Sequence, residues 1–161
     1  MIPNISLYPA LSILSWNANG LYYHKNEFHL TLEEKNIDVA LISETHFTPK
    51  SFVIIPGYQV YHACHPDGTA HAGSAIYIKN NLSHHPLTPY SENYLQATNI
   101  SINLENHNSI TISSIYCPPG AKITTENFKN YFSSLGQQFI AGGDLNSKHP
   151  TCGNRSACTR G

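Results

Sequence analysis

Short runs of apolar residues, many of them β-branched or aromatic, recur along the chain between clusters of Gly, Pro, Asn and Asp. Such runs are typical of β-strands, because branched and aromatic side chains suit a pleated and half-buried surface. Their lengths and boundaries predict strands at residues 11–16, 37–43, 58–63, 72–79, 95–104, 109–116 and 138–141.

Two segments show helical periodicity instead. Residues 24–36 contain no Gly or Pro and place Phe28 and Leu32 one turn apart, as in a helix with one buried face. A second helix is expected after an N-cap at Thr124 or Thr125, with apolar side chains at i, i+3, i+4 and i+7: Phe128, Tyr131, Phe132 and Leu135. This order of elements predicts an α+β fold in which two sheets pack face to face and helices cover the outside.

The composition supports a folded domain and limits how it can bind a partner. The 161 residues suggest one domain, and 40% of them are hydrophobic, which is enough for a packed core. Nine Lys and Arg against ten Asp and Glu leave a net charge of −1, which excludes a strongly basic nucleic-acid binder. A nucleic-acid enzyme stays open, because a bound divalent cation can supply positive charge that the side chains lack.

The apolar runs are also far shorter than the roughly 20 residues of a membrane-spanning helix, and the first residues match no secretion signal. We therefore expect an intracellular protein with no membrane partner. In that setting reduced thiols are expected at all four cysteines, which are Cys64, Cys117, Cys152 and Cys158.

Polar side chains follow several predicted strands at the point where each strand ends: Asn17 and Asn19, Glu44, Tyr116, and Asp144 and Asn146. The ends of strands and the loops after them are where rigid scaffolds carry functional groups. Two carboxylates with an Asn carbonyl make an oxygen-rich site with few protein ligands, which suits Mg²⁺ or Mn²⁺. A hard cation of this kind typically works on phosphate esters.

The same residues fall in four motifs, in this order: SWNANGL at 15–21, ISETH at 42–46, IYCPPG at 115–120 and GGDLNSKHP at 142–150. The ordered set resembles the endonuclease/exonuclease/phosphatase superfamily, and within it the apurinic-type endonuclease domain of Jockey-like and R1-like non-LTR retrotransposons. The resemblance covers residues 11–161 and implies a four-layer α/β/β/α sandwich of the DNase I-like type.

The resemblance also implies a role for each residue. Glu44 and Asn17 match the metal-binding positions, and Asn19 stands where many relatives have an Asp near the metal. Asp144 matches the carboxylate that orients or deprotonates the attacking water. Asn146 and Tyr116 match residues that contact the scissile phosphate. Three further residues flank this set as candidate phosphate or DNA contacts: His46, Lys148 and His149.

The implied reaction is hydrolysis of a DNA phosphodiester with Mg²⁺ or Mn²⁺, leaving a 3′ hydroxyl that primes reverse transcription. The implied partners are target DNA, a reverse transcriptase domain of the same polyprotein and the element's RNA, with the nucleus as the place of action. Two alternatives stay open: a catalytically dead fragment, and a related phosphoesterase that acts on a substrate other than DNA.

One family feature has no counterpart in the sequence. Relatives carry a C-terminal Asp-His pair, and none of the three aspartates here precedes a His. We therefore expect residues 1–10 to be an N-terminal extension and residues 11–161 to be a DNase I-like domain that is incomplete at its C-terminus, before the final strands and the Asp-His motif.

The remaining histidines match no zinc template. His62, His65 and His71 lie near Cys64 in a segment that contains Pro and Gly, and loop polarity explains them better than metal binding. His84 and its neighbour before Pro86 are interpreted as a solvent-exposed turn.

Overall fold

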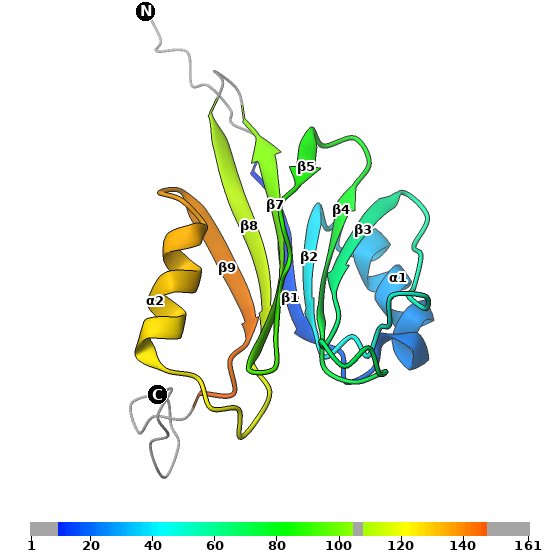
Figure 1. Ribbon diagram of the computed structural model, residues 1–161. Coiled ribbons are helices and arrows are strands. Elements are labelled where there is room, and N and C mark those ends of the chain that lie inside the picture. Colours follow the sequence, from blue (N-terminus) through cyan, green and yellow to red (C-terminus); the bar gives the residue numbers. More distant parts are fainter. Residues whose placement is uncertain (1–9, 105–107, 148–161) are drawn as a thin grey trace, which may run out of the picture.

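The computed structural model describes residues 10–104 and 108–147 (Figure 1). Its elements, in chain order, are β1 (Ile13–Asn17), the 3-10 helix η1 (Leu21–His24), α1 (Lys25–Glu34), β2 (Val39–Ser43), β3 (Tyr58–Ala63), β4 (Ser74–Lys79), β5 (His84–Pro86), β6 (Tyr90–Glu92), β7 (Leu95–Asn103), β8 (Ser109–Tyr116), α2 (Thr125–Ser134) and β9 (Phe139–Asp144).

The strands form two sheets. The first has the order β1-β2-β4-β3, and the second has the order β5-β7-β8-β9 with β6 paired to β7. β1 runs parallel to β2 and β8 runs parallel to β9, whereas the other pairs are antiparallel. The sheets pack face to face, with α1 outside the first and α2 outside the second (Figure 1). The predicted four-layer α/β/β/α arrangement is therefore confirmed.

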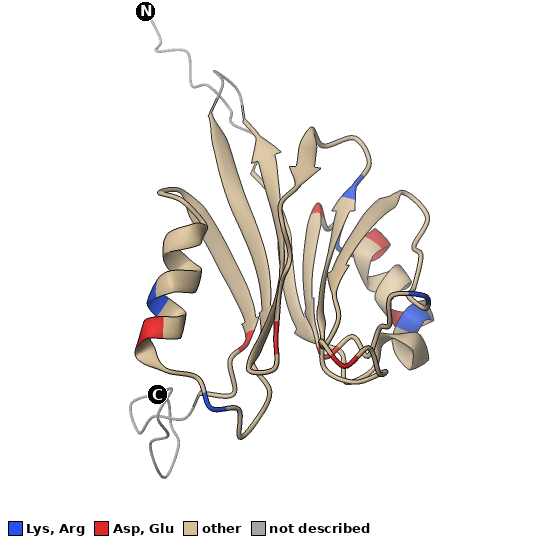
Figure 2. Ribbon diagram, viewed as in Figure 1, with Lys and Arg blue, Asp and Glu red and all other residues tan. Residues whose placement is uncertain are grey.

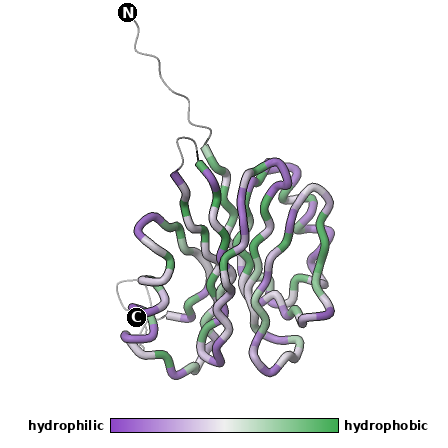
Figure 3. Tube along the Cα trace, turned by 45° about the horizontal axis from the view of Figure 1, so that its top comes forward, coloured by the Kyte–Doolittle hydropathy of each residue, from purple (hydrophilic) through white to green (hydrophobic). Residues whose placement is uncertain are grey.

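β2 shows how the sequence specifies these layers. All five of its residues are buried, and successive side chains point to opposite faces. Ala40 and Ile42 join the core beneath α1, while Val39 and Leu41 join the core between the two sheets. A third core lies between the second sheet and α2, around Tyr131. Figure 3 shows the same pattern, with hydrophobic segments along the central strands and hydrophilic segments in the connecting loops.

Both helices form close to their predicted positions. The first begins with the turn η1 and continues as α1, where Phe28 and Leu32 are buried as expected. Thr124 caps α2, because its Oγ1 accepts the Asn127 N–H at 3.1 Å while Asn127 Oδ1 accepts the Thr124 N–H at 3.0 Å. This reciprocal capping box fixes where the second helix starts.

Two predictions about the histidines are wrong. His84 and Pro86 belong to the short strand β5 rather than to a turn, at an edge of the second sheet. Pro is tolerated there because an edge strand does not need every backbone N–H for pairing. His62 lies on β3 rather than in a loop, with its ring 4.9 Å from that of Phe52 between centroids.

Two further observations bear on the sequence predictions. No helix within residues 10–104 and 108–147 is long and apolar enough to cross a membrane. Cys64 is a free thiol, as expected, and the buried Cys117 donates its S–H to the carbonyl oxygen of Tyr94 at 3.1 Å. Cys152 and Cys158 lie outside the described residues.

Candidate functional site

The carboxyl ends of two parallel strand pairs, one from each sheet, meet at one edge of the sandwich. In the first sheet Asn17 is paired with Ser43, so Glu44 begins the loop directly after β2. In the second sheet Tyr116 is paired with Asp144 at the ends of β8 and β9. The sandwich therefore brings together residues up to 127 positions apart in the sequence, as expected of loops at one end of a rigid scaffold.

Asn17 links the two carboxylates of the site. Its Nδ2 donates to Asp144 Oδ2 at 2.7 Å and to Glu44 Oε1 at 3.2 Å. Its Oδ1 accepts the backbone N–H of Asn19 at 3.0 Å, which fixes the orientation of the amide. Asn17 thus holds the carboxylates of Glu44 and Asp144, one at the end of each sheet, close together.

Tyr116 is the third residue that contacts this group. It is only 5% exposed, and its hydroxyl is hydrogen-bonded to Glu44. Burial raises the pKa of Tyr116 well above its ordinary value, and the hydrogen bond to Glu44 and the charge of Asp144 raise it further. The phenol therefore stays protonated and can donate a hydrogen bond at neutral pH.

Asn146 lies in the loop directly after β9. Its backbone N–H donates to Asp144 Oδ1 at 2.8 Å, and its Nδ2 donates to the carbonyl oxygen of Cys117 at 3.1 Å. Asp144 therefore accepts hydrogen bonds on both oxygens, one from Asn17 and one from Asn146. The side chain of Asp144 is held in one orientation at the edge.

Unusual backbone geometry is concentrated at this edge. Positive φ angles of 43°, 52°, 56° and 47° occur at Asn19, Glu44, His46 and Asn146. Such angles are uncommon outside glycine and recur where a protein holds functional groups in fixed positions. Gly20 has a φ of 95°, and a Cβ there would lie 3.1 Å from Nδ1 of His46, so these two loops pack closely.

The donor set fits a hard divalent cation. Glu44 and Asp144 each supply a carboxylate oxygen that accepts from the same Asn17 amide nitrogen, at 3.2 and 2.7 Å. Acidic segments gather at this end of both sheets (Figure 2), where they would repel a phosphate unless a cation lies between them. Oxygen ligands of this kind are those that Mg²⁺ and Mn²⁺ prefer. The residues present therefore fit the expected metal, with Glu44 and Asn17 as the residues that would hold it and the Asp144 carboxylate beside them.

The remaining predicted residues divide into two groups. Asn19 contributes its backbone N–H to Asn17, and His46 lies beside Gly20 at the rim. Lys148 and His149 lie outside the described residues.

Two exposed aromatic residues at the rim escaped the sequence analysis. Tyr22 and Tyr23 are 72% and 88% exposed, and they line a groove of about 350 Å³ together with His46 and Phe52. The available signal was two consecutive Tyr residues close to the turn at residues 17–20, since loops at the surface often carry binding residues.

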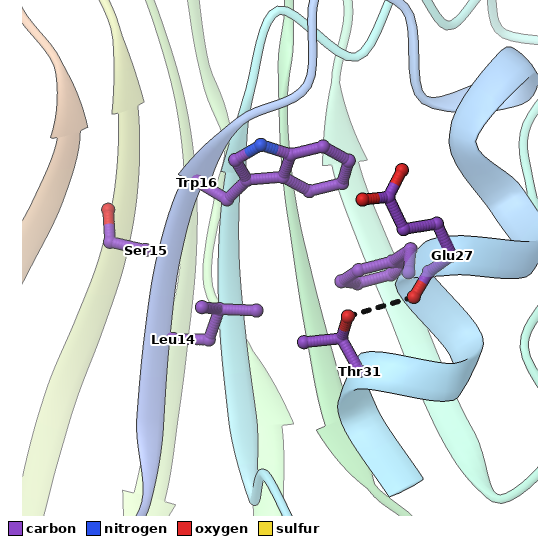
Figure 4. Close-up of a pocket in the computed structure, with 6 residues that line it drawn as sticks. Leu14, Ser15, Trp16, Glu27 and Thr31 are labelled. Carbon is purple, nitrogen blue, oxygen red and sulfur yellow. Dashed lines mark hydrogen bonds between the residues drawn. The ribbon is translucent and has the colours of Figure 1, made fainter. Parts of the chain in front are cut away.

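A cavity elsewhere in the fold has little polar chemistry to offer. It measures about 220 Å³ and lies between β1 and α1, with Leu14, Trp16 and Phe28 in its lining (Figure 4). Its Thr31 hydroxyl donates to the backbone carbonyl of Glu27 at 2.9 Å. The open edge, with its carboxylates and amides, is therefore the better candidate for a functional site.

The layered sandwich with paired carboxylates at the ends of its strands defines a protein of the DNase I-like fold class. Its sequence matches the model of the endonuclease/exonuclease/phosphatase family over residues 14–161, so the chain belongs to this family.

The curated relatives are proteins of mobile elements. The chain is 41% identical over 153 residues to the RNA-directed DNA polymerase from mobile element jockey of Drosophila melanogaster, covering 95% of this chain. It is 38% identical over 144 residues to the probable RNA-directed DNA polymerase from transposon X-element of the same species, covering 86% of this chain. The chain spans only 17% and 15% of the lengths of these two relatives.

Solved structures share the fold. The endonuclease domain of TRAS1, a telomere-specific non-LTR retrotransposon, superposes with a TM-score of 0.71 at 22% identity, covering 94% of this chain and 68% of that one. The AP endonuclease LMAP from Leishmania major gives a TM-score of 0.68 at 14% identity, covering 85% of this chain and 55% of that one. At these identities the likeness establishes the fold alone.

Proposed function

We propose that the chain is a divalent-metal-dependent DNA endonuclease domain of a non-LTR retrotransposon polyprotein. The observation that carries the proposal is the Asn17 amide, which joins Glu44 and Asp144 at distances of 3.2 and 2.7 Å beside the protonated Tyr116. Family membership and the similarity to the jockey protein support the choice of a nucleic-acid substrate over other phosphate esters.

The proposed reaction is hydrolysis of one phosphodiester in the target strand. A water oxygen bonds to phosphorus, the bond from phosphorus to the 3′ oxygen breaks, and that oxygen leaves with a proton as the 3′ hydroxyl. Mg²⁺ or Mn²⁺, when bound, neutralises charge on the phosphate and on the leaving oxygen.

Each residue has a part that matches its position. Glu44 and Asn17 hold the cation site, and Asn19 supports Asn17 through the bond from its backbone N–H. Asp144 orients the attacking water and accepts its proton, since its two oxygens are held by fixed donors. Tyr116, whose O–H is bonded to Glu44 without substrate, turns this donor to the phosphate, where a neutral donor stabilises the charge that develops on the oxygens.

Further residues extend the proposed DNA contact. Asn146 is proposed to contact the scissile phosphate, with its side chain held in place by the bond from Nδ2 to the Cys117 carbonyl oxygen. His46, Lys148 and His149 are proposed to contact the DNA backbone around this centre. The exposed Tyr22 beside His46 offers an aromatic face against which a base or sugar can pack.

We further propose that the active nuclease forms within a longer polypeptide. Within the described residues, β1 pairs only with β2 and β9 pairs only with β8, so each sheet has an open edge on the same side. Phe139 and Ile140 on β9 are 38% and 41% exposed there. Open strand edges and exposed apolar side chains are features that proteins normally cover. The partners proposed for that polypeptide are its reverse transcriptase domain, the element RNA and nuclear target DNA.

The chemical group at the 3′ end of the cleaved strand tests the proposal. The longer polypeptide is incubated with supercoiled plasmid and Mg²⁺, and the nicked product is offered to a DNA polymerase that extends only a 3′ hydroxyl. Extension from the nick, absent in Asp144→Asn and present in the exposed control Glu33→Gln, is the expected result.

A substrate panel separates the alternatives in the same experiment. Hydrolysis of inositol phosphates or phospholipids without nicking would identify a related phosphoesterase. No hydrolysis of any substrate by a folded protein would identify a catalytically dead remnant. Either outcome would overturn the proposal.

A further inference from the structure

The connection between β3 and β4 gathers three side chains that bind metals well. His65, Asp67 and His71 each offer one ligand atom, and these atoms all lie within 4.8 Å of one another. His65 Nδ1 lies 3.1 Å from Asp67 Oδ1, and His71 Nε2 lies 3.7 Å from Asp67 Oδ2. The two imidazole rings have centroids 4.3 Å apart. Sequence spacing alone matched no zinc template, but the turn of the loop brings the three groups together.

A fourth side chain orients this cluster. The Thr69 hydroxyl is hydrogen-bonded to His71 Nδ1 at 2.7 Å and to Asp67 Oδ1 at 3.0 Å. Because Nδ1 of His71 is engaged by Thr69, its Nε2 is the nitrogen left to face Asp67. Partners of this kind fix the ring orientation of metal-binding histidines.

The ligand chemistry differs from that of the catalytic edge. Two imidazoles and a carboxylate form a nitrogen-rich set that suits Zn²⁺, whereas Mg²⁺ prefers oxygen ligands. Zinc bonds of about 2.0 to 2.1 Å hold neighbouring ligand atoms roughly 3.3 Å apart. The observed separations are 3.1 Å from His65 to Oδ1 of Asp67 and 3.7 Å from His71 to Oδ2, and one ligand atom from each residue lies within 4.8 Å of the others, so small side-chain movements would close the set around an ion. The exposure of His71 and Asp67 leaves room for a water as the fourth ligand.

We propose that His65, Asp67 and His71 bind one Zn²⁺ ion that is separate from the catalytic cation and orders the loop at residues 64–73. This loop lies against the catalytic edge, since the His46 N–H donates to the Ala72 carbonyl at 2.9 Å. An ordered loop would hold His46 and the residues around Glu44 in place. The site does not depend on the nuclease activity proposed above, because it uses none of the residues assigned to that chemistry.

Zinc binding is measured by competition with a chromophoric chelator. Tag-free polypeptide carrying Cys152→Ser and Cys158→Ser is used, so that thiols outside the described residues do not contribute. We expect one equivalent of zinc, an affinity at least tenfold lower in Asp67→Ala, and loss of binding in the double variant His65→Ala/His71→Ala. The matched control His85→Ala, which removes an exposed histidine on β5, should bind zinc as the parent does.

Two further measurements identify the ligands. Cobalt should replace zinc without a thiolate charge-transfer band, because Cys64 is not one of the ligands. Glu44→Gln should keep the zinc while losing magnesium-dependent nicking, so that failure of this site and failure of the proposed nuclease centre are distinguishable. Absence of stoichiometric zinc, or equal zinc affinity in the double variant and the parent, would overturn the proposal.

Discussion

Gly143 pairs with Ile115 where β9 meets β8, and it directly precedes Asp144. Its backbone therefore helps to position the carboxylate of Asp144. Its φ is 145°, and a Cβ built there would overlap the carbonyl oxygen of Ile115 and lie 2.8 Å from the carbonyl carbon. Those atoms belong to the backbone of the neighbouring strand, so no side-chain rotation can relieve the contact. We predict that Gly143→Ala forces β9 away from β8 and shifts Asp144 relative to Tyr116.

The magnitude follows from two contributions. A positive φ at a residue with a Cβ costs about 1 to 3 kcal/mol, and overpacking in a close-packed interior costs about 1 to 3 kcal/mol more. We therefore expect Gly143→Ala to lower the free energy of unfolding by about 2 to 6 kcal/mol. Such a loss is a large fraction of the 5 to 15 kcal/mol that is typical of whole domains, as a rough guide.

Gly136 provides a matched control. Its φ of 85° is also positive, but a Cβ there would meet nothing within 4 Å. Gly136→Ala should therefore show the backbone strain without the overlap. Urea unfolding followed by circular dichroism measures both variants, and the midpoint of Gly143→Ala should be clearly the lower. Equal midpoints for the two variants would show that the overlap with Ile115 adds no cost.

Three further predictions concern charge and hydrogen bonding. Tyr116→Phe removes the neutral donor beside Glu44, and a hydrogen bond to a charged group contributes about 1.5 to 3 kcal/mol, so the single-turnover nicking rate should fall roughly 10- to 100-fold; a rate within twofold of wild type would contradict the assigned role. Mg²⁺ at 100 times its dissociation constant should stabilise the wild type by about 2.7 kcal/mol in thermal unfolding, and an equal gain in Glu44→Gln would place the cation elsewhere. Burial raises the pKa of Asp38, but hydrogen bonds from Lys79 and from the Ser12 N–H outweigh it and hold the pKa below the ordinary 3.8. Because this pKa is depressed on folding, the stabilisation is present above pH 3.8 and lost as the pH falls through the folded value. Asp38→Asn should thus lower the free energy of unfolding in urea by about 1 to 2 kcal/mol at pH 7, and by progressively less below pH 3.8. A cost that does not change with pH would count against the ion pair with Lys79.

Local sequence patterns predicted the elements whose residues meet one clear local requirement, such as burial on both faces or a capping hydrogen bond. The continuous apolar run of β2 is buried on both faces, and such a run has few alternatives to a central strand. Thr124 could be recognised as a cap because a hydroxyl before a helical period has a clear local partner. The short strands β5 and β6 were missed, because three polar or Pro-containing residues at an edge carry no periodic signal.

The candidate site was predicted as a set of residue types but not as a geometry. Motifs singled out Asn17, Glu44 and Asp144 because each follows a strand. The orientation of the Asn17 amide toward both carboxylates depends on how two sheets pack across 127 positions of sequence, which no local pattern encodes. Similarly, His65 and His71 fit no spacing template, since the turn through Asp67 and Thr69 determines their proximity.

Glu44 and Asp144 are proposed to form one metal-dependent nicking centre. The most direct test is single-turnover nicking of supercoiled plasmid by the longer polypeptide, titrated with Mg²⁺ and with Mn²⁺. We expect nicking that requires one of the two cations, and losses of at least about 100-fold in both Glu44→Gln and Asp144→Asn, equivalent to roughly 2.7 kcal/mol of transition-state stabilisation. Nicking at the wild-type rate in either variant, or without a divalent cation, would contradict it.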